Sequence, residues 1–301
     1  MLKLIIAIAS VFVLSSLLFI YFVPLGTNIF IASPKSSNFS LEGSSMQFYP
    51  NLRFATPEIS YKISSDCILQ KQNDMEYAMN IVENLTALEF YPVENNEDIA
   101  ISCKDRNVNA GNGFFVAGEG GPTNITVAGD FNVITHGDIV LIRESKCETP
   151  NVGIHELFHV LGFEHSPNRN NIMYNVTDCK QTIGEDMLHL LDELYSVPSN
   201  PDLYFEDVSA EMKGRFLNVN MTVFNGGLKD SANAEINIYA DGDLVKQVEL
   251  NELEIGGGRS ISLGNVFISK INVNTLEIQI SSEFDEINKE NNKIKLEIKN
   301  N

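Results

Sequence analysis

Positive charge is scarce in this chain. Lysine and arginine together number 21 of the 301 residues, whereas aspartate and glutamate number 40, which gives a formal net charge of −19 at pH 7. Proteins that bind nucleic acid or an anionic membrane surface carry the opposite balance, because their partner is negative. The composition therefore argues against both kinds of partner and fits a soluble ectodomain.

Cysteine is also scarce, and none of the four cysteines lies in a Cys-x-x-Cys pair or in the Cys/His spacing of a structural zinc site. The glycine-rich stretch 111–124 lacks the spacing of a phosphate-binding loop and the lysine that follows such a loop. We expect a plain loop there, with no role in binding a phosphate group.

The longest apolar run lies at the N-terminus. From Leu4 to Val23 the chain is apolar except for three serines and a tyrosine, and Lys3 precedes the run. Twenty such residues suffice to cross about 30 Å of hydrocarbon, whereas the apolar core of a secretory signal peptide has about 7–15 residues. The run favours an uncleaved membrane anchor over a cleaved signal. Both interpretations keep Lys3 inside the cell and export the rest of the chain.

Histidine is rare too, but three of the five histidines fall in the segment His155-Glu-Leu-Phe-His-Val-Leu-Gly-Phe-Glu-His165. His155 and His159 are four residues apart, so on a helix their imidazoles share one face and can bind one metal ion. Gly162 can adopt the left-handed conformation that ends a helix, which lets His165 approach the same ion. Three protein ligands leave a fourth position for water, as in catalytic zinc sites.

The glutamate beside the first histidine has a different expected role. Glu156 projects away from its neighbour His155, so it can act as the general base that takes a proton from the zinc-bound water. The flanking residues indicate a helix with Thr149 as N-cap, Pro150 at the first position and Gly162 at the end.

The two remaining histidines are expected to have no functional role. An isolated histidine is usually an ordinary, partly buried residue, and His136 and His189 have no partner in the sequence. We expect both to belong to the fold or the surface. A second, structural zinc site is therefore not expected.

The extended motif resembles that of the metzincin metallopeptidases, and within them the matrixins, in which a tight turn containing methionine follows the third histidine. Here that turn is Asn171-Ile-Met-Tyr174, and Ser166 after the third histidine is also similar to matrixins. The resemblance implies that Met173 packs beneath the imidazoles, that Tyr174 is structural, and that the chain hydrolyses peptide bonds.

The resemblance covers residues 52–197 and implies an α+β catalytic domain with a mixed twisted sheet, the zinc helix and a closing helix. Apolar periodicity predicts the first helix over 70–88 and the closing helix over 185–195. Strand-like runs lie at 89–93, 99–103 and 138–143. In the family the substrate lies extended along the edge of the sheet and pairs through its backbone.

Four cysteines in an exported chain allow two disulfides, in three possible connectivities. Cys147 and Cys179 bracket the zinc helix and the methionine turn, so a bond between them would tie this segment closed. Cys67 paired with Cys103 would then brace the front of the domain. These two pairings are the hypothesis that we favour.

The chain changes character after a linker at 198–202. Residues 203–301 contain about seven short alternating strands, which is typical of an all-β, immunoglobulin-like sandwich. Asp241-Gly242 is a hairpin signal between two of them. The strands named by their pattern are 216–224, 234–239 and 275–280.

This C-terminal segment resembles the adhesion-related CARDB modules of prokaryotic surface proteins. The resemblance lies in Thr222–Gly227, in the hairpin Tyr239–Val245 and in Asn288–Asn292 before the last strand. It implies a surface protein or a glycan as partner. The acidic stretch 283–290 leaves a calcium ion open, although a solvated loop is favoured because the ligand spacing of a known calcium loop is missing.

The expected organisation is an anchor or signal, a stalk, the matrixin-like domain, a linker and the sandwich, at 1–23, 24–51, 52–197, 198–202 and 203–301. The function expected is a zinc endopeptidase, held at the cell surface by a single-pass N-terminal transmembrane helix, or secreted if that segment is cleaved. One alternative is an adhesion or scaffold protein with a non-catalytic metzincin domain, against which the intact Glu156 argues. Another is a zinc hydrolase that acts on something other than a peptide.

Overall fold

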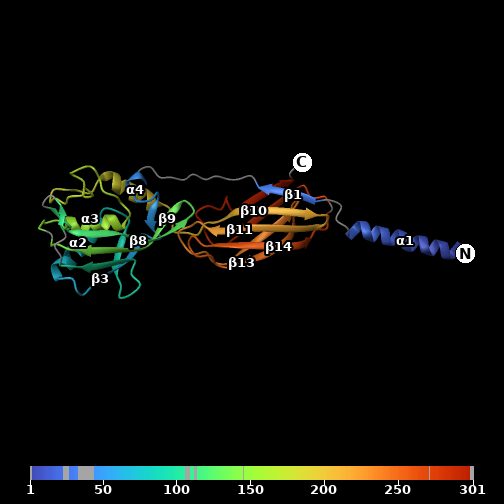
Figure 1. The fold of residues 1–301 in the computed structure, drawn as a ribbon, viewed down its shortest axis with the longest axis horizontal. Coiled ribbons are helices and arrows are strands. Elements are labelled where there is room, and N and C mark those ends of the chain that lie inside the picture. Colours follow the sequence, from blue (N-terminus) through green and yellow to red (C-terminus); the bar gives the residue numbers. More distant parts are fainter. Residues whose placement is uncertain are drawn as a thin grey trace. The chain divides into compact units, whose positions relative to one another are not determined.

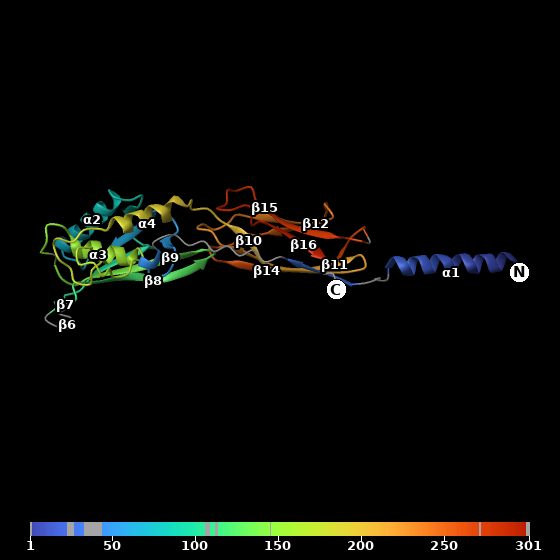
Figure 2. The same cartoon turned by 90° about the horizontal axis from the view of Figure 1, so that it is seen from above.

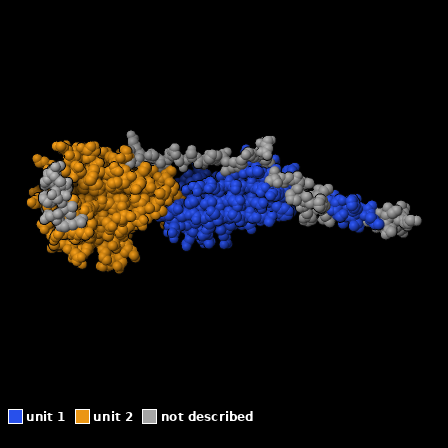
Figure 3. Space-filling view, in the orientation of Figure 1, with its two compact units in different colours: residues 1–36, 201–225, 230–301 blue, residues 37–200, 226–229 orange. Residues whose placement is uncertain are grey.

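The computed structural model describes residues 2–22, 27–32, 44–105, 109–111, 114–144, 146–270 and 272–298. They form two compact units (Figures 1 and 3). Unit 1 comprises residues 1–36, 201–225 and 230–301, and unit 2 comprises residues 37–200 and 226–229. Each unit has its own apolar core.

Unit 2 is built on a mixed sheet, as expected. The sheet order is β2-β9-β5-β3-β4, and β8 pairs with the long strand β9. All pairings along this order are parallel, whereas β8 runs antiparallel to β9. The strands are β2 (Leu52–Phe54), β3 (Glu58–Ile63), β4 (Glu89–Pro92), β5 (Ile99–Cys103), β8 (Gly118–Ala128) and β9 (Phe131–Leu141).

The expectation of a plain loop over 111–124 was wrong for most of its length. Residues Asn109–Gly111 and Phe114–Phe115 form a small hairpin, β6 and β7, and Gly118 begins the eleven-residue strand β8. Glycine weakens a strand and removes the alternation of side chains, so no periodicity marked this one. Its pairing with β9 and the close approach of a helix override the low propensity of the sequence.

Three helices cover the sheet: α2 (Leu69–Glu83), α3 (Asn151–Val160) and α4 (Glu185–Ser196). The predicted first helix is confirmed but ends at Glu83 rather than at residue 88, and Leu85 beyond it is exposed. α3 lies between α2 and the long strand β8 (Figure 2). The helix that carries the histidine motif is therefore held between a second helix and the sheet.

Two disulfides brace unit 2. One joins Cys67 to Cys103 and the other joins Cys147 to Cys179. These are the same two pairs that the sequence analysis favoured. The second bond closes a segment that begins just before α3 and ends after the turn at Met173.

Unit 1 contains the seven C-terminal strands that were expected. β13, β12, β15 and β16 follow one another in hydrogen-bonded order, and so do β10, β11 and β14. Asp241 and Gly242 both have positive φ, 46° and 85°, as a tight hairpin turn requires. The strands are β10 (Leu203–Lys213), β11 (Phe216–Asn225), β12 (Ala234–Ala240), β13 (Asp243–Leu250), β14 (Gly258–Phe267), β15 (Thr275–Ser281) and β16 (Lys293–Ile298).

An eighth strand of unit 1 comes from the other end of the chain. Residues Thr27–Ala32, expected in a stalk over 24–51, form β1, which pairs antiparallel with both β10 and β16. β1 thereby joins the four-stranded and the three-stranded sets into one continuous order. Its sequence is too short and too far from residue 203 to be assigned to the sandwich by periodicity. The matrixin-like segment is thus an insertion between the first and second strands of the sandwich.

We expect Phe30→Ala to destabilise unit 1 by about 3–5 kcal/mol, the usual cost of deleting a buried aromatic ring. Phe30 is 1 % exposed and packs in the core of unit 1. Ile29 is its neighbour on the opposite face of β1 and is 51 % exposed, so Ile29→Ala is the matched control. Denaturant unfolding of a chain that begins at residue 27 measures both. Equal destabilisation by the two variants would contradict the placement of β1.

At the N-terminus, residues Leu2–Phe22 form the single helix α1. Across the part of the chain that the structure describes, no helix is found that is long and apolar enough to cross a membrane. Val23 and Met1, the other residues of the expected anchor, lie outside the described residues.

Candidate metal centre

The histidine motif lies on α3 and on the turn that follows it. Ile154, Leu157 and Phe158 are buried and fix the helix against the core. The N-cap is Pro150 rather than the expected Thr149, and its side chain does not cap the helix, because proline has no side-chain hydrogen-bond acceptor. His155 and His159 lie one turn apart on this helix.

Gly162 ends the helix region for two reasons that both require glycine. Its φ is +99°, a backbone conformation that is strained for a residue with a side chain. A Cβ at this position would also lie 2.7 Å from Cδ2 of Leu52 on β2. The chain can therefore turn sharply here and return His165 towards the helix.

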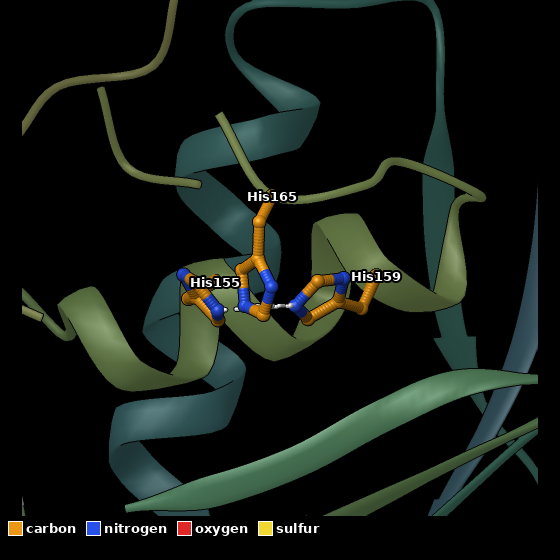
Figure 4. Close-up of side chains that lie close together, drawn as sticks. All are labelled: His155, His159 and His165. Carbon is orange, nitrogen blue, oxygen red and sulfur yellow. Dashed lines mark hydrogen bonds between the residues drawn. The ribbon is translucent and has the colours of Figure 1, made fainter. Parts of the chain in front are cut away.

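The three imidazoles converge on one point (Figure 4). Nε2 of His159 lies 3.1 Å from Nε2 of His155 and 3.2 Å from Nε2 of His165. Nitrogens of all three rings lie within 4.8 Å of one another. His155 and His159 are buried, whereas His165 is exposed and forms the open side of the cluster.

Backbone carbonyls fix the tautomers of the two buried rings. Nδ1 of His155 lies 2.6 Å from the carbonyl oxygen of Ile172, and Nδ1 of His159 lies 2.8 Å from that of Phe163. A carbonyl only accepts, so both Nδ1 atoms donate and carry the proton. Both Nε2 atoms then present lone pairs to each other, which repel unless a cation lies between them.

The protonation equilibria of the cluster favour a cation as well. Burial, and then the neighbouring His155, lower the pKa of His159 from 6.5 to about 4. Burial also lowers the pKa of His155. Both rings are therefore neutral at pH 7 and can bind a metal ion without first losing a proton.

The geometry fits zinc. Tetrahedral zinc with Zn–N distances of about 2.0–2.1 Å separates its ligand nitrogens by about 3.3 Å. The two Nε2 separations at His159, 3.1 and 3.2 Å, are close to that value. A histidine that binds a metal usually donates its other ring N–H to a carbonyl or carboxylate, which orients the ring, as both Nδ1 atoms do here. Within the described ranges, this is the one group of three or more such side chains that could hold a metal ion.

Glu156 is buried beside the cluster, at 5 % exposure. Burial, and then the charge of Glu119, raise the pKa of Glu156 to about 8. A nearby cation would lower it again, because an opposite charge stabilises the carboxylate. A bound cation would therefore convert Glu156 from a buried neutral acid to a carboxylate.

Two protein-family models match the chain, one for each of its two large parts. Residues 53–196 match the matrixin family model, and residues 200–300 match the CARDB family model. The resemblance to matrixins is confirmed. The chain therefore joins a matrixin-like domain, whose histidine motif is the cluster described above, to a CARDB-like module.

Other comparisons add less. No curated protein matches the sequence. A crystal structure of a CARDB domain from Pyrococcus furiosus, in complex with di-metal ions, is 15% identical, with a TM-score of 0.28, and covers 33% of this chain and 88% of that one. A solution structure of a domain of a putative cell surface protein from Methanosarcina acetivorans is 19% identical, with a TM-score of 0.28, and covers 33% and 91%.

The methionine turn of the matrixin-like domain is tied to two of the histidines. The carbonyl of Ile172 accepts from His155, and the carbonyl of Met173 accepts from the N–H of Ser166, directly after His165. Met173 is 1 % exposed within the core. Tyr174 is outside the three-histidine group and lies under the guanidinium of Arg169, 5.9 Å from it, in keeping with a structural role.

The glycines of β8 were not recognised as part of the site. A Cβ on Gly118 would lie 2.6 Å from Oε1 of Glu156, and one on Gly120 would lie 2.4 Å from the carbonyl oxygen of Glu156. These glycines let β8 lie directly against α3, which buries Glu156. The only sign of this contact in the sequence is the series of glycines, and a series of glycines is equally typical of a loop.

We expect Gly120→Ala to destabilise unit 2 by about 1–3 kcal/mol, because β8 must move away from α3 to admit the methyl group. Gly121→Ala is the matched control, since a Cβ there meets nothing within 4 Å. Calorimetric unfolding compares the two variants. If Gly120→Ala unfolds at the same temperature as Gly121→Ala, the close contact between β8 and α3 does not exist.

The two other histidines and the acidic stretch have contacts of their own within the fold. His136 lies 3.1 Å from the carbonyl oxygen of Glu97, and the exposed His189 pairs with Glu193 along α4. In the acidic stretch 283–290, Glu286 accepts hydrogen bonds from the N–H of Leu203 and from the amide of Asn292. Its carboxylate thus holds the loop together, and a calcium ion is not required to explain it.

Proposed function

We propose that the chain is a zinc-dependent endopeptidase. The observation that carries the proposal is the convergence of the three Nε2 atoms next to a buried glutamate, in a domain that matches the matrixin family model. His155, His159 and His165 would hold the ion. Bound there, zinc would polarise both a water molecule and the scissile carbonyl.

Glu156 supplies the base. Its burial between α3 and β8 raises its pKa to about 8 in the metal-free site, and a bound cation would lower that pKa again and leave a carboxylate at neutral pH. The carboxylate can then take a proton from the attacking water and later deliver it to the leaving amine. The proton moves between groups that the fold already holds together. The two buried histidines stay neutral because burial lowers their pKa, and backbone carbonyls hold the proton of each ring on Nδ1.

The substrate would lie along β8. Among the described residues, β8 pairs with one strand, β9, so its other edge, next to Glu156, faces no second strand. An extended peptide can add to such an edge by backbone hydrogen bonds, in which side chains alternate between the site and solvent. Cleavage inside a chain, rather than at its end, follows from an edge that continues past the metal ligands.

The test is cleavage of casein or an internally quenched peptide by a fragment that begins at residue 27. The proposal predicts cleavage that stops when zinc is chelated and returns when zinc is restored. Intact casein and peptide under all zinc concentrations would favour the alternative, a surface adhesion or scaffold protein. Cleavage of an ester or amide that is not a peptide, without cleavage of peptides, would favour a different zinc hydrolase.

We also propose that the N-terminal segment holds the domain at the outer face of the cell membrane. The apolar run Leu4–Val23 after Lys3 and the two disulfides support export. In cells that express the full chain, external protease should remove unit 2, and alkaline carbonate should leave the chain in the membrane pellet. A chain released into the medium without residues 1–23 would instead show a cleaved signal.

A further inference from the structure

A cavity of about 650 Å³ opens beside the metal centre. Its apolar lining comes from Phe48 and Tyr49 on one wall and from Pro122 and Ile125 of β8 on the other. Glu164 is the one charged side chain among the described residues that line it. The cavity is large enough for a side chain of any size, since ligand sites span about 300–1,000 Å³.

The wall of this cavity is fixed to the metal ligands. The N–H of Phe48 donates to the carbonyl of Gly162 over 2.9 Å, and the N–H of Glu164 donates to the carbonyl of Met46 over 2.9 Å. The ring of Phe48 stacks against that of His159, with centroids 5.9 Å apart. Residues 46–49, which the sequence analysis left in the stalk, therefore belong to the site.

β8 connects the cavity to the catalytic glutamate. Gly118 lies against Glu156, and the cavity begins at Gly121, three residues or about 10 Å further along the strand. The register with β9 shifts between Pro122 and Ile125, so the strand is irregular where it lines the cavity. Such irregularities often redirect side chains next to active sites.

The direction of β8 decides which part of a peptide reaches the cavity. Antiparallel pairing is the slightly more stable arrangement, and it places peptide residues opposite Gly121–Ile125 before those opposite Gly118. The cavity would therefore receive a side chain on the N-terminal side of the scissile bond, several residues from it.

The chemistry of the lining selects one kind of side chain. Phe48 and Tyr49 are 37 % and 53 % exposed, so their rings are available to a long aliphatic stem or a cation. Glu164 is exposed at the same opening and supplies a carboxylate. An acidic substrate side chain would face this carboxylate in a chain of net charge −19.

We propose that this cavity is a specificity pocket for a lysine or arginine side chain that lies N-terminal to the scissile bond of the substrate. The inference rests on the proposed peptidase function. It names the substrate class as peptides with a basic residue at one position before the cleaved bond.

The test uses peptides that are identical except at one residue, with lysine, its neutral counterpart norleucine, or glutamate placed in turn at each of the positions before the scissile bond. We expect lysine to exceed norleucine in kcat/KM by about 3- to 30-fold at one position, through KM, as a partly exposed ion pair with an aromatic contact allows. Glutamate at that position should be the poorest substrate.

Two variants distinguish the pocket from general attraction by an acidic protein. Glu164→Gln should abolish the preference for lysine over norleucine, whereas Glu185→Gln, which removes an exposed charge of the same unit outside the cavity, should preserve it. Zinc content of each variant verifies an intact site. A lysine preference that survives Glu164→Gln, or a preference for norleucine, overturns the proposal.

Binding separates this inference from the proposed function. Fluorescence anisotropy of the same labelled peptides is measured on the zinc-loaded Glu156→Gln protein, which needs no cleavage. If no peptide is cleaved by the native protein but the lysine peptide binds more tightly and loses this advantage in Glu156→Gln/Glu164→Gln, the pocket stands and the peptidase function falls. If peptides are cleaved and bind without any lysine preference, the pocket falls and the function stands.

Discussion

Replacement of Glu156 by glutamine is expected to lower kcat for peptide cleavage by about 10²–10⁴-fold while zinc remains bound. Glutamine keeps the size and the hydrogen-bonding shape of the side chain but cannot accept the proton of the attacking water. Because the three histidines would hold the ion without Glu156, the zinc content should stay at about one per chain. Cleavage assays and metal analysis of the same preparation measure both quantities.

The stability of this variant provides a second readout. The folded pKa of Glu156 is raised to about 8 from 4.5, so without a bound cation the stabilising effect of its proton is complete below pH 4.5 and is lost as the pH rises through 8. Glu156→Gln removes that dependence, so at pH 8 the metal-free variant should unfold at the same or a higher temperature than the native chain.

The matched control is Glu185→Gln, an exposed change at the start of α4. It should leave cleavage, zinc content and unfolding temperature unchanged. Loss of zinc together with activity in Glu156→Gln would show that the glutamate supports the site rather than acting as base. Full activity in Glu156→Gln would remove Glu156 from the reaction.

The local part of the site could be predicted from the sequence because its parts are close in the chain. His155, His159, Gly162 and His165 lie within eleven residues, and helical geometry alone brings the first two together. The methionine turn follows directly. The hydrogen bond from Nδ1 of His155 to the carbonyl of Ile172 joins residues only seventeen positions apart in the chain.

Contacts between distant segments could not be predicted in this way. Phe48 reaches His159 across more than one hundred residues, and the glycines of β8 reach Glu156 through the pairing of a sheet. A single sequence shows which residues are apolar or small, but not which distant segments become neighbours. The strand β1 was missed for the same reason, since its partners begin at residue 203.

Arg53 illustrates the same limit in the core. It is 1 % exposed, and its guanidinium donates to the carbonyls of Leu194 and Val197 and lies 4.3 Å from the ring centroid of Tyr195. The first strand of the domain is thereby fixed to the end of its last helix. A charged residue in a short strand is predicted to be exposed. Burial of an arginine is stable only when hydrogen-bond partners surround it, and the sequence does not show where those partners lie.

The second large effect is expected from His159→Ala, which should abolish stable zinc binding. His159 is the central member of the cluster, with Nε2 close to both other Nε2 atoms, so its removal leaves two ligands that no longer face a common neighbour. The loss of affinity should exceed the roughly 10–100-fold that follows when a group hydrogen-bonded to a metal ligand is removed. His189→Ala, on the exposed face of α4, is the control and should retain zinc.

The pH dependence of zinc release tests the same histidine without a mutation. A proton competes with the metal only below the pKa of the ligand, and burial lowers that of His159 to about 4. Zinc should therefore stay bound between pH 6.5 and about 5, where an ordinary imidazole is protonated, and a chromogenic chelator should report release only near pH 4. The free energy of unfolding of the metal-free chain should also depend on pH. Between pH 6.5 and 4 the folded state binds fewer protons than the unfolded state, so its stability is full above this window and falls as the pH decreases through it. Release of zinc at pH 6 to 6.5, with no acid destabilisation of the metal-free protein, would mean that His159 is not the buried ligand that holds the ion.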